Sequence, residues 1–172
     1  MVIERPIAFV DLDGTLFDNT HRRHLLPTGD GSTIEQWKTF NRACVEDELI
    51  QHMKALVNFL YMQDYNVVLL TGRAEHCRVE TLHCLIHYHI HYHTLITREN
   101  NDHRKSADFK KEVLSCWFGS CTDSRRFPEG SFFIDDDPSV LAMVEEEFPE
   151  LNIIKCASKC SSVQAGKSQA GE

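Results

Sequence analysis

Short apolar runs alternate along the chain with segments in which apolar residues recur at helical spacing. Five runs are predicted to be strands, and most are rich in Val, Ile and Phe: 7–11, 66–70, 94–97, 131–135 and 152–156. Strands that alternate with helices are typical of βαβ units, which build a parallel sheet. Continuous apolar runs indicate strands that are covered on both faces. The pattern therefore predicts an α/β fold, with a parallel five-stranded sheet and helices on both of its faces.

The helical patterns fall between these strands, at about 34–44, 49–60, 74–88, 107–118 and 138–148. Ser32 and Glu35 have the spacing of a capping box before the first helix, and Asp47 is a candidate cap for the second. Gly119 is placed to end the fourth helix, while Asp137 and Pro138 suit the start of the fifth.

At roughly 100–200 residues per domain, 172 residues predict one domain. We expect this domain to cover residues 1–157, with residues 17–47 as a small cap-like insertion between the first two strands. Residues 158–172 are small and polar, which is typical of a flexible tail.

The charge balance narrows the classes of partner. The chain has 18 basic and 26 acidic side chains and a net charge of −8, which argues against a general binder of nucleic acid or anionic membranes. No apolar run approaches the ~20 residues of a membrane span, and the first one lacks the pattern of a signal peptide. The seven cysteines contain no CxxC pair, so we expect reduced thiols and a cytoplasmic protein.

Polar residues follow three of the predicted strands directly. Asp11 and Asp13 follow the first, Thr71 to Arg73 the second, and Asp135 to Asp137 come at the end of the fourth. The carboxyl ends of parallel strands share one edge of a sheet, where ligands bind. Carboxylates gathered there would repel each other unless a cation lay between them, and hard oxygen ligands suit Mg²⁺. The alternative is that these aspartates only form turns and helix caps.

These motifs resemble the haloacid dehalogenase (HAD) superfamily of phosphotransferases. The matching residues are DLDGTL from Asp11, TGR from Thr71, Lys110, and IDDD with Asp135 and Asp136. The resemblance implies a Rossmann-like HAD fold with a minimal cap insertion.

In that family the residue at Asp11 attacks phosphorus and forms an aspartyl-phosphate, while Asp13 first protonates the leaving oxygen and then deprotonates water. Thr71 and Lys110 would hold the phosphoryl oxygens, where their contribution is electrostatic. The residues implied for Mg²⁺ are Asp11, Asp13 through its backbone carbonyl, Asp135 and Asp136.

Within the superfamily, the chain is most similar to the 3′-phosphatase domains of bacteriophage polynucleotide kinase-phosphatases and their stand-alone relatives. The resemblance implies phosphate-binding or catalytic roles for Arg22, Gly72, Arg73 and Arg104, in addition to Lys110. Ser106 replaces an aspartate of that family, so one ligand-orienting carboxylate is absent.

No kinase domain is expected in this chain. Gly166, Lys167 and Ser168 lack the earlier glycine of a P-loop, because Ser161 stands in its place.

Two features have simpler interpretations as well. The alternating histidines 87, 89, 91 and 93 could form a metal site, but they precede the third strand, so a surface or core role is favoured. Trp37 and Phe40 could stack on bases, yet their helical spacing with Ile34 favours a core role.

The leading hypothesis is a Mg²⁺-dependent phosphomonoesterase of the bacterial or phage-infected cytoplasm, which removes 3′-phosphates from polynucleotide ends or nucleotides. The alternatives are a housecleaning phosphatase of free mononucleotides and a catalytically silent binding protein. DNA or RNA preference and oligomeric state stay open.

Overall fold

The computed structural model of the protein describes residues 5–27, 34–120 and 126–157. Its centre is a five-stranded parallel sheet in the order β5-β4-β1-β6-β7. The strands are β1 (Ile7–Val10), β4 (Asn66–Ala74), β5 (Thr94–Arg98), β6 (Phe132–Asp135) and β7 (Asn152–Lys155). The predicted fold class and all five strands are therefore confirmed.

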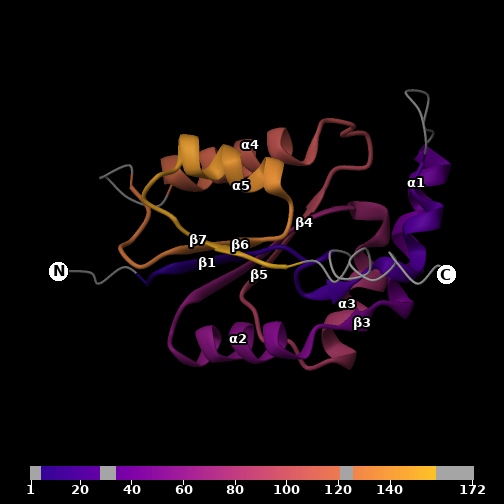
Figure 1. Ribbon diagram of the computed structural model, residues 1–172, viewed down its shortest axis with the longest axis horizontal. Helices are drawn as coiled ribbons and strands as arrows, with labels where there is room; N and C mark the ends of the chain where they lie inside the picture. The colour runs from indigo at the N-terminus through magenta and orange to yellow at the C-terminus, as the bar shows by residue number, and fades with distance from the viewer. Residues whose placement is uncertain (1–4, 28–33, 121–125, 158–172) are drawn as a thin grey trace, which may run out of the picture.

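Helices cover both faces of the sheet, as predicted. In Figure 1, α4 (Ser106–Ser120) and α5 (Pro138–Glu147) lie on one face, and α2 (Gln51–Met62) and α3 (Arg78–His87) on the other. Helix α1 (Ile34–Arg42) stands beyond the carboxyl ends of the strands (Figure 1). Three short 3₁₀ helices complete the order: η1 (Thr20–Leu25), η2 (Ala43–Glu46) and η3 (Glu75–Cys77).

Strand β1 shows why the sheet is buried on both sides. Ala8 and Val10 belong to the core cluster that includes residues of α2 and α3, whereas Ile7 and Phe9 belong to the cluster with α4 and α5. Successive side chains of a strand point to opposite faces, so an all-apolar strand must be covered twice.

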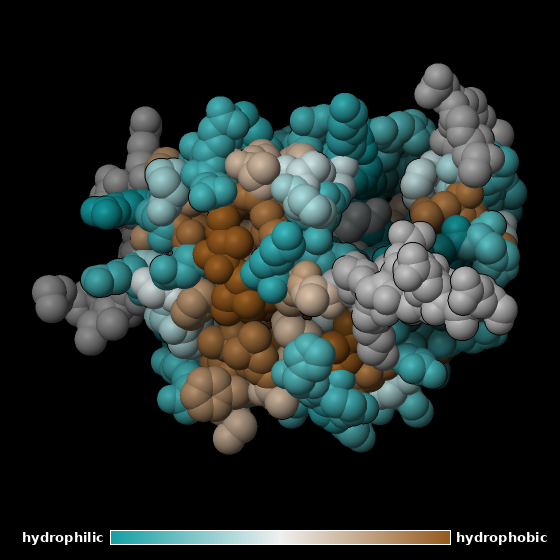
Figure 2. All heavy atoms as spheres, in the orientation of Figure 1, coloured by the Kyte–Doolittle hydropathy of each residue, from teal (hydrophilic) through white to brown (hydrophobic). Residues whose placement is uncertain are grey.

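The sheet ends at β7, the last strand in its order. Figure 2 shows hydrophobic residues gathered over β6 and β7, between α5 and α2. Ile153 and Ile154 of β7 are partly buried against the two core clusters. The central strand β1, by contrast, is buried along its whole length.

The segment between β1 and α2 contains β2 (Phe17–Asp18), η1, α1, η2 and β3 (Glu48–Leu49). Strands β2 and β3 form a separate antiparallel pair, with Phe17 opposite Leu49. The predicted capping box at Ser32 and the tail from residue 158 lie outside the described residues.

Three local predictions need correction. Gly119 does not end the fourth helix but lies inside α4, because glycine can adopt helical backbone angles as well as those of a C-cap. Asp47 does not cap α2, whose N-cap is Ile50; its carboxylate is used elsewhere. The second strand runs on through Thr71 to Ala74, with a register shift after Leu70.

Other local predictions hold. The Asp137 side chain accepts a hydrogen bond from Ser139 N at 2.8 Å and caps α5, with Pro138 in the first helical position. The five described cysteines, 44, 77, 84, 116 and 156, are free thiols. No helix among the described residues is long and apolar enough to cross a membrane.

Candidate active site

The DLDGTL motif turns sharply at the carboxyl end of β1. Gly14 has a φ of +89°, and a Cβ at this position would lie 2.3 Å from an Asp136 carboxylate oxygen. Only glycine allows both the left-handed backbone and the close approach of Asp136. The neighbouring Thr15 hydroxyl donates to the same carboxylate, at 3.4 Å. The turn thereby brings the ends of β1 and β6 together.

Strand β1 is also where the direction of the sheet order changes, since β4 lies on one side of it and β6 on the other. Such a switch point is the usual ligand crevice of an open α/β sheet. The predicted edge is therefore the one at which the polar residues meet.

Lys110 and Asp11 form the first of two clusters at this edge, which we call the lysine cluster. The Lys110 Nζ lies 2.7 Å from an oxygen of Asp11 and 2.7 Å from an oxygen of Asp135. All three residues are at most 6% exposed. Helix α4 thus brings a residue 99 positions away in sequence onto the end of β1.

Asp136 completes the cluster. One carboxylate oxygen from each of Asp11, Asp135 and Asp136 lies within 4.8 Å of the other two. Burial raises the pKa of Asp11 to about 8, with Asp135 adding to the rise and Lys110 opposing it. The pKa of Asp136 is also raised, first by burial and then by Asp135.

The donor set of this cluster fits a divalent metal ion. Three carboxylates surround a single ammonium group, so negative charge is in excess, and the pKa of Asp11 shows that its ionised form is disfavoured. Oxygen ligands at this spacing are those that hard divalent cations take. Within the described part of the chain, Asp11, Asp135 and Asp136 form the group that could hold such an ion.

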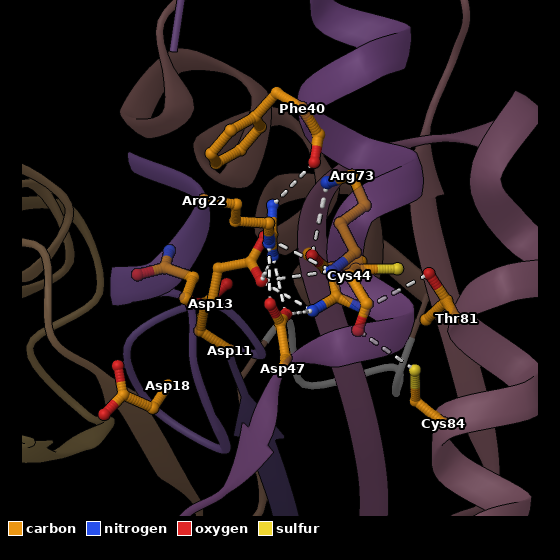
Figure 3. Close-up of polar contacts among 12 residues, drawn as sticks. Asp11, Asp13, Asp18, Arg22, Phe40, Cys44, Asp47, Arg73, Thr81 and Cys84 are labelled. Carbon is orange, nitrogen blue, oxygen red and sulfur yellow. Dashed lines mark hydrogen bonds and ion pairs between the residues drawn. The ribbon is translucent and has the colours of Figure 1, made fainter. Parts of the chain in front are cut away.

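The second cluster, which we call the arginine cluster, surrounds Asp13 (Figure 3). Arg22 comes from η1, Arg73 from β4, and Asp47 follows η2. Arg73 donates to Asp13 through Nε at 3.1 Å and Nη2 at 2.6 Å, and Arg22 Nη2 donates to the same Oδ1 atom of Asp13.

Asp47 holds both arginines from the other side. Its Oδ1 accepts from Arg22 Nε at 2.7 Å, and its Oδ2 accepts from Arg22 Nη2 and from Arg73 Nη2, each at 2.7 Å. Asp47 is 1% exposed, and Arg22 and Arg73 are fully buried. The Arg22 guanidinium also lies 4.3 Å from the centre of the Phe40 ring, over its face.

Two carboxylates and two guanidinium groups give this cluster a balanced charge. Burial alone would raise the pKa of Asp13, but Arg73 and Arg22 outweigh it and hold the pKa below its usual range. Asp13 is therefore an ionised carboxylate in this arrangement, one fifth exposed at its side chain.

The sequence-predicted site residues fall into different surroundings. Asp11, Lys110, Asp135 and Asp136 come together as expected, and Asp13 turns its side chain to the arginine cluster. Thr71 is fully buried, and its hydroxyl accepts from Arg73 N at 3.2 Å.

Arg104 is exposed and pairs with Asp102 at 2.8 Å and with Glu112. Its predicted contact with phosphate stays a prediction, as do the predicted phosphate contacts of Arg22, Gly72 and Arg73.

A cavity of about 750 Å³ opens between the two clusters. Residues of both clusters line it, namely Asp11, Asp13, Lys110, Asp135 and Asp136, together with Trp37, Phe40, Asn41, Gly72, Ala74, His76, Arg98, Asn100, the segment 102–106 and Asp137. Its volume lies within the range of small-molecule sites, and it exceeds the size of a phosphoryl group.

Trp37 and Phe40 contribute to this lining. Phe40 is 6% exposed and Trp37 36% exposed, so the pair combines a packed ring with a half-open one. The preference for a core role thus holds for Phe40 but only partly for Trp37.

The histidines at 87, 89 and 91 are exposed, and His93 accepts at Nδ1 from Val67 N at 3.1 Å. They lie between α3 and the start of β5, at the edge opposite the clusters, which confirms the surface assignment.

Sequence reasoning missed Asp47 and Arg98. Asp47 was interpreted as a helix cap, and no residue spacing signals a partner for Arg22 and Arg73 that lies 25 and 26 positions away. Arg98 belongs to no recognised motif. Only its position after the third apolar run, at the edge of the sheet where the polar residues gather, could have indicated that it lines the site.

Comparison with known proteins decides the family. Residues 5–146 match the family model of the polynucleotide kinase PNKP phosphatase domain. The chain belongs to this family. It is thus a phosphatase domain of the HAD class, as the motifs indicated.

Solved structures agree with this assignment. A chain described as part of the Pnkp1/Rnl/Hen1 complex is similar with 26% identity and a TM-score of 0.69, over 90% of this protein and 47% of that chain. A second, described as the Pnkp1/Rnl/Hen1 RNA repair complex, has 25% identity and a TM-score of 0.66, over 90% and 43%. This protein therefore spans less than half the length of those chains.

A class C acid phosphatase from Bacillus anthracis with tungstate bound shares the fold, with a TM-score of 0.57 at 14% identity, over 91% of this protein and 68% of that chain. A comparison with curated proteins found no match.

Proposed function

We propose that this domain is a Mg²⁺-dependent phosphomonoesterase that removes 3′-phosphates from polynucleotide ends through an aspartyl-phosphate intermediate. The observation that carries the proposal is the separation of Asp11 and Asp13 into two clusters that line one cavity. One carboxylate faces a lysine and further carboxylates, and the other faces two arginines. A nucleophile and an acid–base residue need different surroundings of this kind.

In the first step, the free carboxylate oxygen of Asp11 attacks phosphorus, and the bond from phosphorus to the 3′-oxygen breaks. The departing oxygen takes a proton from Asp13. Asp13 must enter this step protonated: the two arginines lower its pKa in the free domain, and the negative charge of a bound phosphate would oppose them. A covalent intermediate divides a difficult displacement into two easier steps.

In the second step, water attacks the phosphorus of the aspartyl-phosphate and gives a proton to Asp13. Inorganic phosphate leaves and Asp11 regains its carboxylate. Asp13 is already ionised in the arrangement described above, which is the form that accepts this proton.

Asp11, Asp135 and Asp136 would hold the Mg²⁺ ion, together with the backbone carbonyl of Asp13. When bound, the ion supplies positive charge to the phosphoryl oxygens. Lys110 keeps Asp11 and Asp135 in place at 2.7 Å and adds a fixed positive charge beside the reacting group. Gly72 of β4 lines the cavity and would bind a phosphoryl oxygen through its backbone N–H, whereas the neighbouring Thr71 is fully buried and its hydroxyl accepts from Arg73 N.

Three observations support a polynucleotide end as substrate. The family model is that of a polynucleotide kinase-phosphatase, a similar solved structure is described as an RNA repair complex, and the cavity is larger than a phosphoryl group. The free thiols suit a cytoplasmic location.

Hydrolysis of p-nitrophenyl phosphate with Mg²⁺ tests the chemistry. Asp11→Asn should abolish turnover and prevent labelling of the enzyme by the substrate's phosphoryl group, and chelation should abolish turnover of the wild type. Asp64→Asn is the matched control, because Asp64 is exposed and only pairs with Arg5. An active Asp11→Asn enzyme would contradict the aspartyl-phosphate mechanism.

A substrate panel tests the specificity. We expect the highest kcat/KM for 3′-phosphorylated oligonucleotides, compared with 3′- and 5′-mononucleotides. Equal or faster turnover of 5′-mononucleotides would instead support a phosphatase of free nucleotides.

A further inference from the structure

The cavity extends beyond the two clusters along a polar wall built by the segments that follow β4 and β5. His76, Arg98 and Asn100 form this part of the wall. None of them belongs to a motif that the phosphoryl-transfer steps use. The contacts and charges around these three residues indicate which kind of ligand group this part of the wall would bind.

Arg98 is held in a fixed position on this wall. It pairs with Ala74 in the sheet, its guanidinium carbon lies 5.0 Å from the centre of the Phe109 ring, over its face, and its Nη1 donates to the carbonyl of Arg104. Its Nη2 lies 3.7 Å from the point that a Cβ on Gly72 would occupy. The guanidinium therefore stands beside the residue that follows Thr71.

The positive charge of Arg98 is poorly compensated. The nearest carboxylate in its electrostatic surroundings, Asp102, accepts three hydrogen bonds from Arg104, and this pairing lowers the pKa of Asp102 to about 2. Burial and the charge of Arg104 lower the pKa of Arg98, with Asp102 opposing them. A half-buried cation in this position is stabilised by an incoming anion.

Two polar atoms of the wall are buried without a hydrogen-bond partner among the described residues. They are Nε of Arg98 and Nε2 of His76. His76 donates to Asn100 Oδ1 from its backbone N at 2.7 Å, and its Nδ1 lies 3.0 Å from the same oxygen. Both atoms have almost no accessible surface, so they do not themselves face a ligand, but they show that the protein alone leaves polar groups around Arg98 and His76 unsatisfied.

The position of Arg98 separates it from the reacting phosphate. Asp11 follows β1, Gly72 belongs to the adjacent β4, and Arg98 ends β5, the next strand out. With about 4.8 Å between neighbouring strands, the end of β5 lies about 10 Å from the end of β1. The Arg98 side chain reaches back to Gly72 on the intervening strand, so an anion bound on the far side of Arg98 from Gly72 would be a second group of the same substrate.

We propose that Arg98 binds a second phosphate of the substrate, the phosphodiester on the 5′ side of the terminal nucleotide. The proposal rests on the proposed function, since it assumes that the 3′-phosphate occupies the Asp11 end of the cavity. The contact with Arg98 explains how a chain with a net charge of −8 holds a polynucleotide. A single arginine beside the reacting end binds the backbone, so a broad basic surface is not needed. Arginine suits this role because its planar fork can bind two phosphate oxygens at once.

Two nucleotides that differ by one phosphate test the proposal directly. We would measure kcat/KM for release of the 3′-phosphate from thymidine 3′-monophosphate and from thymidine 3′,5′-bisphosphate. In the wild type the bisphosphate is the better substrate. Arg98→Gln should lower the ratio of the two kcat/KM values at least tenfold, mainly through the KM of the bisphosphate. Arg98→Lys should recover part of the ratio, because it restores the charge without the fork.

Arg78→Gln is the matched control. Arg78 lies on α3, bonds to Thr97 and to the Leu95 carbonyl, and does not line the cavity. Its substitution should leave the ratio at the wild-type value. Turnover of the monophosphate by each variant reports on folding and on the catalytic groups in the same experiment.

Two other outcomes would refute the second-phosphate site, and a third would refute the proposed substrate class as well. If Arg98→Gln lowers kcat/KM for both nucleotides by the same factor, Arg98 acts on the reacting phosphate or on the fold, and the second-phosphate site is refuted. It is also refuted if the wild type does not prefer the bisphosphate. If the wild type hydrolyses p-nitrophenyl phosphate but neither 3′-phosphate, the proposed substrate class itself is wrong, and the site proposed here is wrong with it.

Discussion

Asp11 and Asp13 are two residues apart in sequence, yet they lie in opposite electrostatic surroundings. Asp11 belongs to the lysine cluster, in which Lys110 bonds to Asp11 and Asp135, and Asp136 adds a third carboxylate beside them. Asp13 belongs to the arginine cluster, in which two carboxylates face two guanidinium groups. The pKa of Asp11 is raised to about 8, mainly by burial, whereas the pKa of Asp13 is lowered because the arginines outweigh its burial.

The charge balance of each cluster explains the difference. The arginine cluster is neutral as it stands, so it can be fully buried and hold a carboxylate in its ionised form. The lysine cluster carries excess negative charge, which a divalent cation would balance. The two environments thus separate the pKa values of two carboxylates of one motif, and a divalent cation in the lysine cluster would favour the ionised form of Asp11.

After the loss of Asp11, which should abolish turnover, removing the carboxylate of Asp13 should have the largest effect on activity. General acid–base catalysis contributes about 10²- to 10⁴-fold, so we expect Asp13→Asn to lose that much kcat/KM on a 3′-phosphorylated oligonucleotide. p-Nitrophenolate leaves without a proton, so the first turnover of p-nitrophenyl phosphate should be slowed far less. Rapid-quench measurement of the first turnover compares the two substrates, and equal losses would argue against proton donation by Asp13.

Removing Asp47 should break the arginine cluster itself. Asp47→Ala leaves two buried guanidinium groups with only Asp13 as a shared carboxylate among the described residues, and loss of one member of a buried ion pair costs about 3–5 kcal/mol. Chemical denaturation measures the free energy of unfolding. Asp64→Asn, at an exposed pair, should change it by less than about 1 kcal/mol, and a similarly small change for Asp47→Ala would show that the cluster does not stabilise the fold.

The lysine cluster should lower the stability of the metal-free protein at high pH, and a bound metal ion should restore that stability. Asp11 has a folded pKa of about 8, above its ordinary value of 3.8, so folding favours the protonated form and stability is lost as pH rises through about 8. In the metal-free protein, Asp11→Asn removes this loss and should be the more stable form at pH 9, by the order of 1 kcal/mol.

Thermal unfolding at pH 6 and pH 9, with chelator and with Mg²⁺, measures this effect. Mg²⁺ should stabilise the wild type and reverse the order of the two proteins at pH 9. If the difference in unfolding temperature between wild type and variant does not change with pH, the surroundings of Asp11 in the lysine cluster do not raise its pKa.

The smallest effect is expected at the outer contact of the arginine cluster. Arg73 Nη1 donates to the buried hydroxyl of Thr81 at 3.4 Å. Thr81→Val keeps the volume and removes this acceptor, which should cost about 1 kcal/mol of unfolding free energy. Because Asp47 and Asp13 still hold Arg73, kcat should change less than twofold, and a large loss of activity would mean that Thr81 positions the arginine.

Most of the fold could be predicted from the sequence because its signals are local. A run such as Ile7 to Val10 reports burial on both faces, and Asp137 before Pro138 reports a helix start, whatever the rest of the chain does. Gly119 shows the limit of such signals, since a glycine suits a helix end but does not force one.

The lysine cluster could be predicted for a related reason. Asp11 and Asp135 end their strands, and parallel strands bring their carboxyl ends to the same edge, so sequence position alone implies that they meet. The arginine cluster could not, because Asp47 reaches Arg22 and Arg73 through the packing of η1, η2 and β4, which no periodicity encodes.

The sequence by itself thus determined the sheet, the edge at which its polar residues gather and the motifs of the family. Only the tertiary structure decided which charges neutralise each other: that Asp13 faces arginines, that Asp47 holds them, and that Arg98 faces the cavity with little compensation. The physical reason is that strand and helix patterns depend on neighbours within a few residues. The pKa of a buried carboxylate, in contrast, depends on charges a few ångströms away that lie tens of residues distant along the chain.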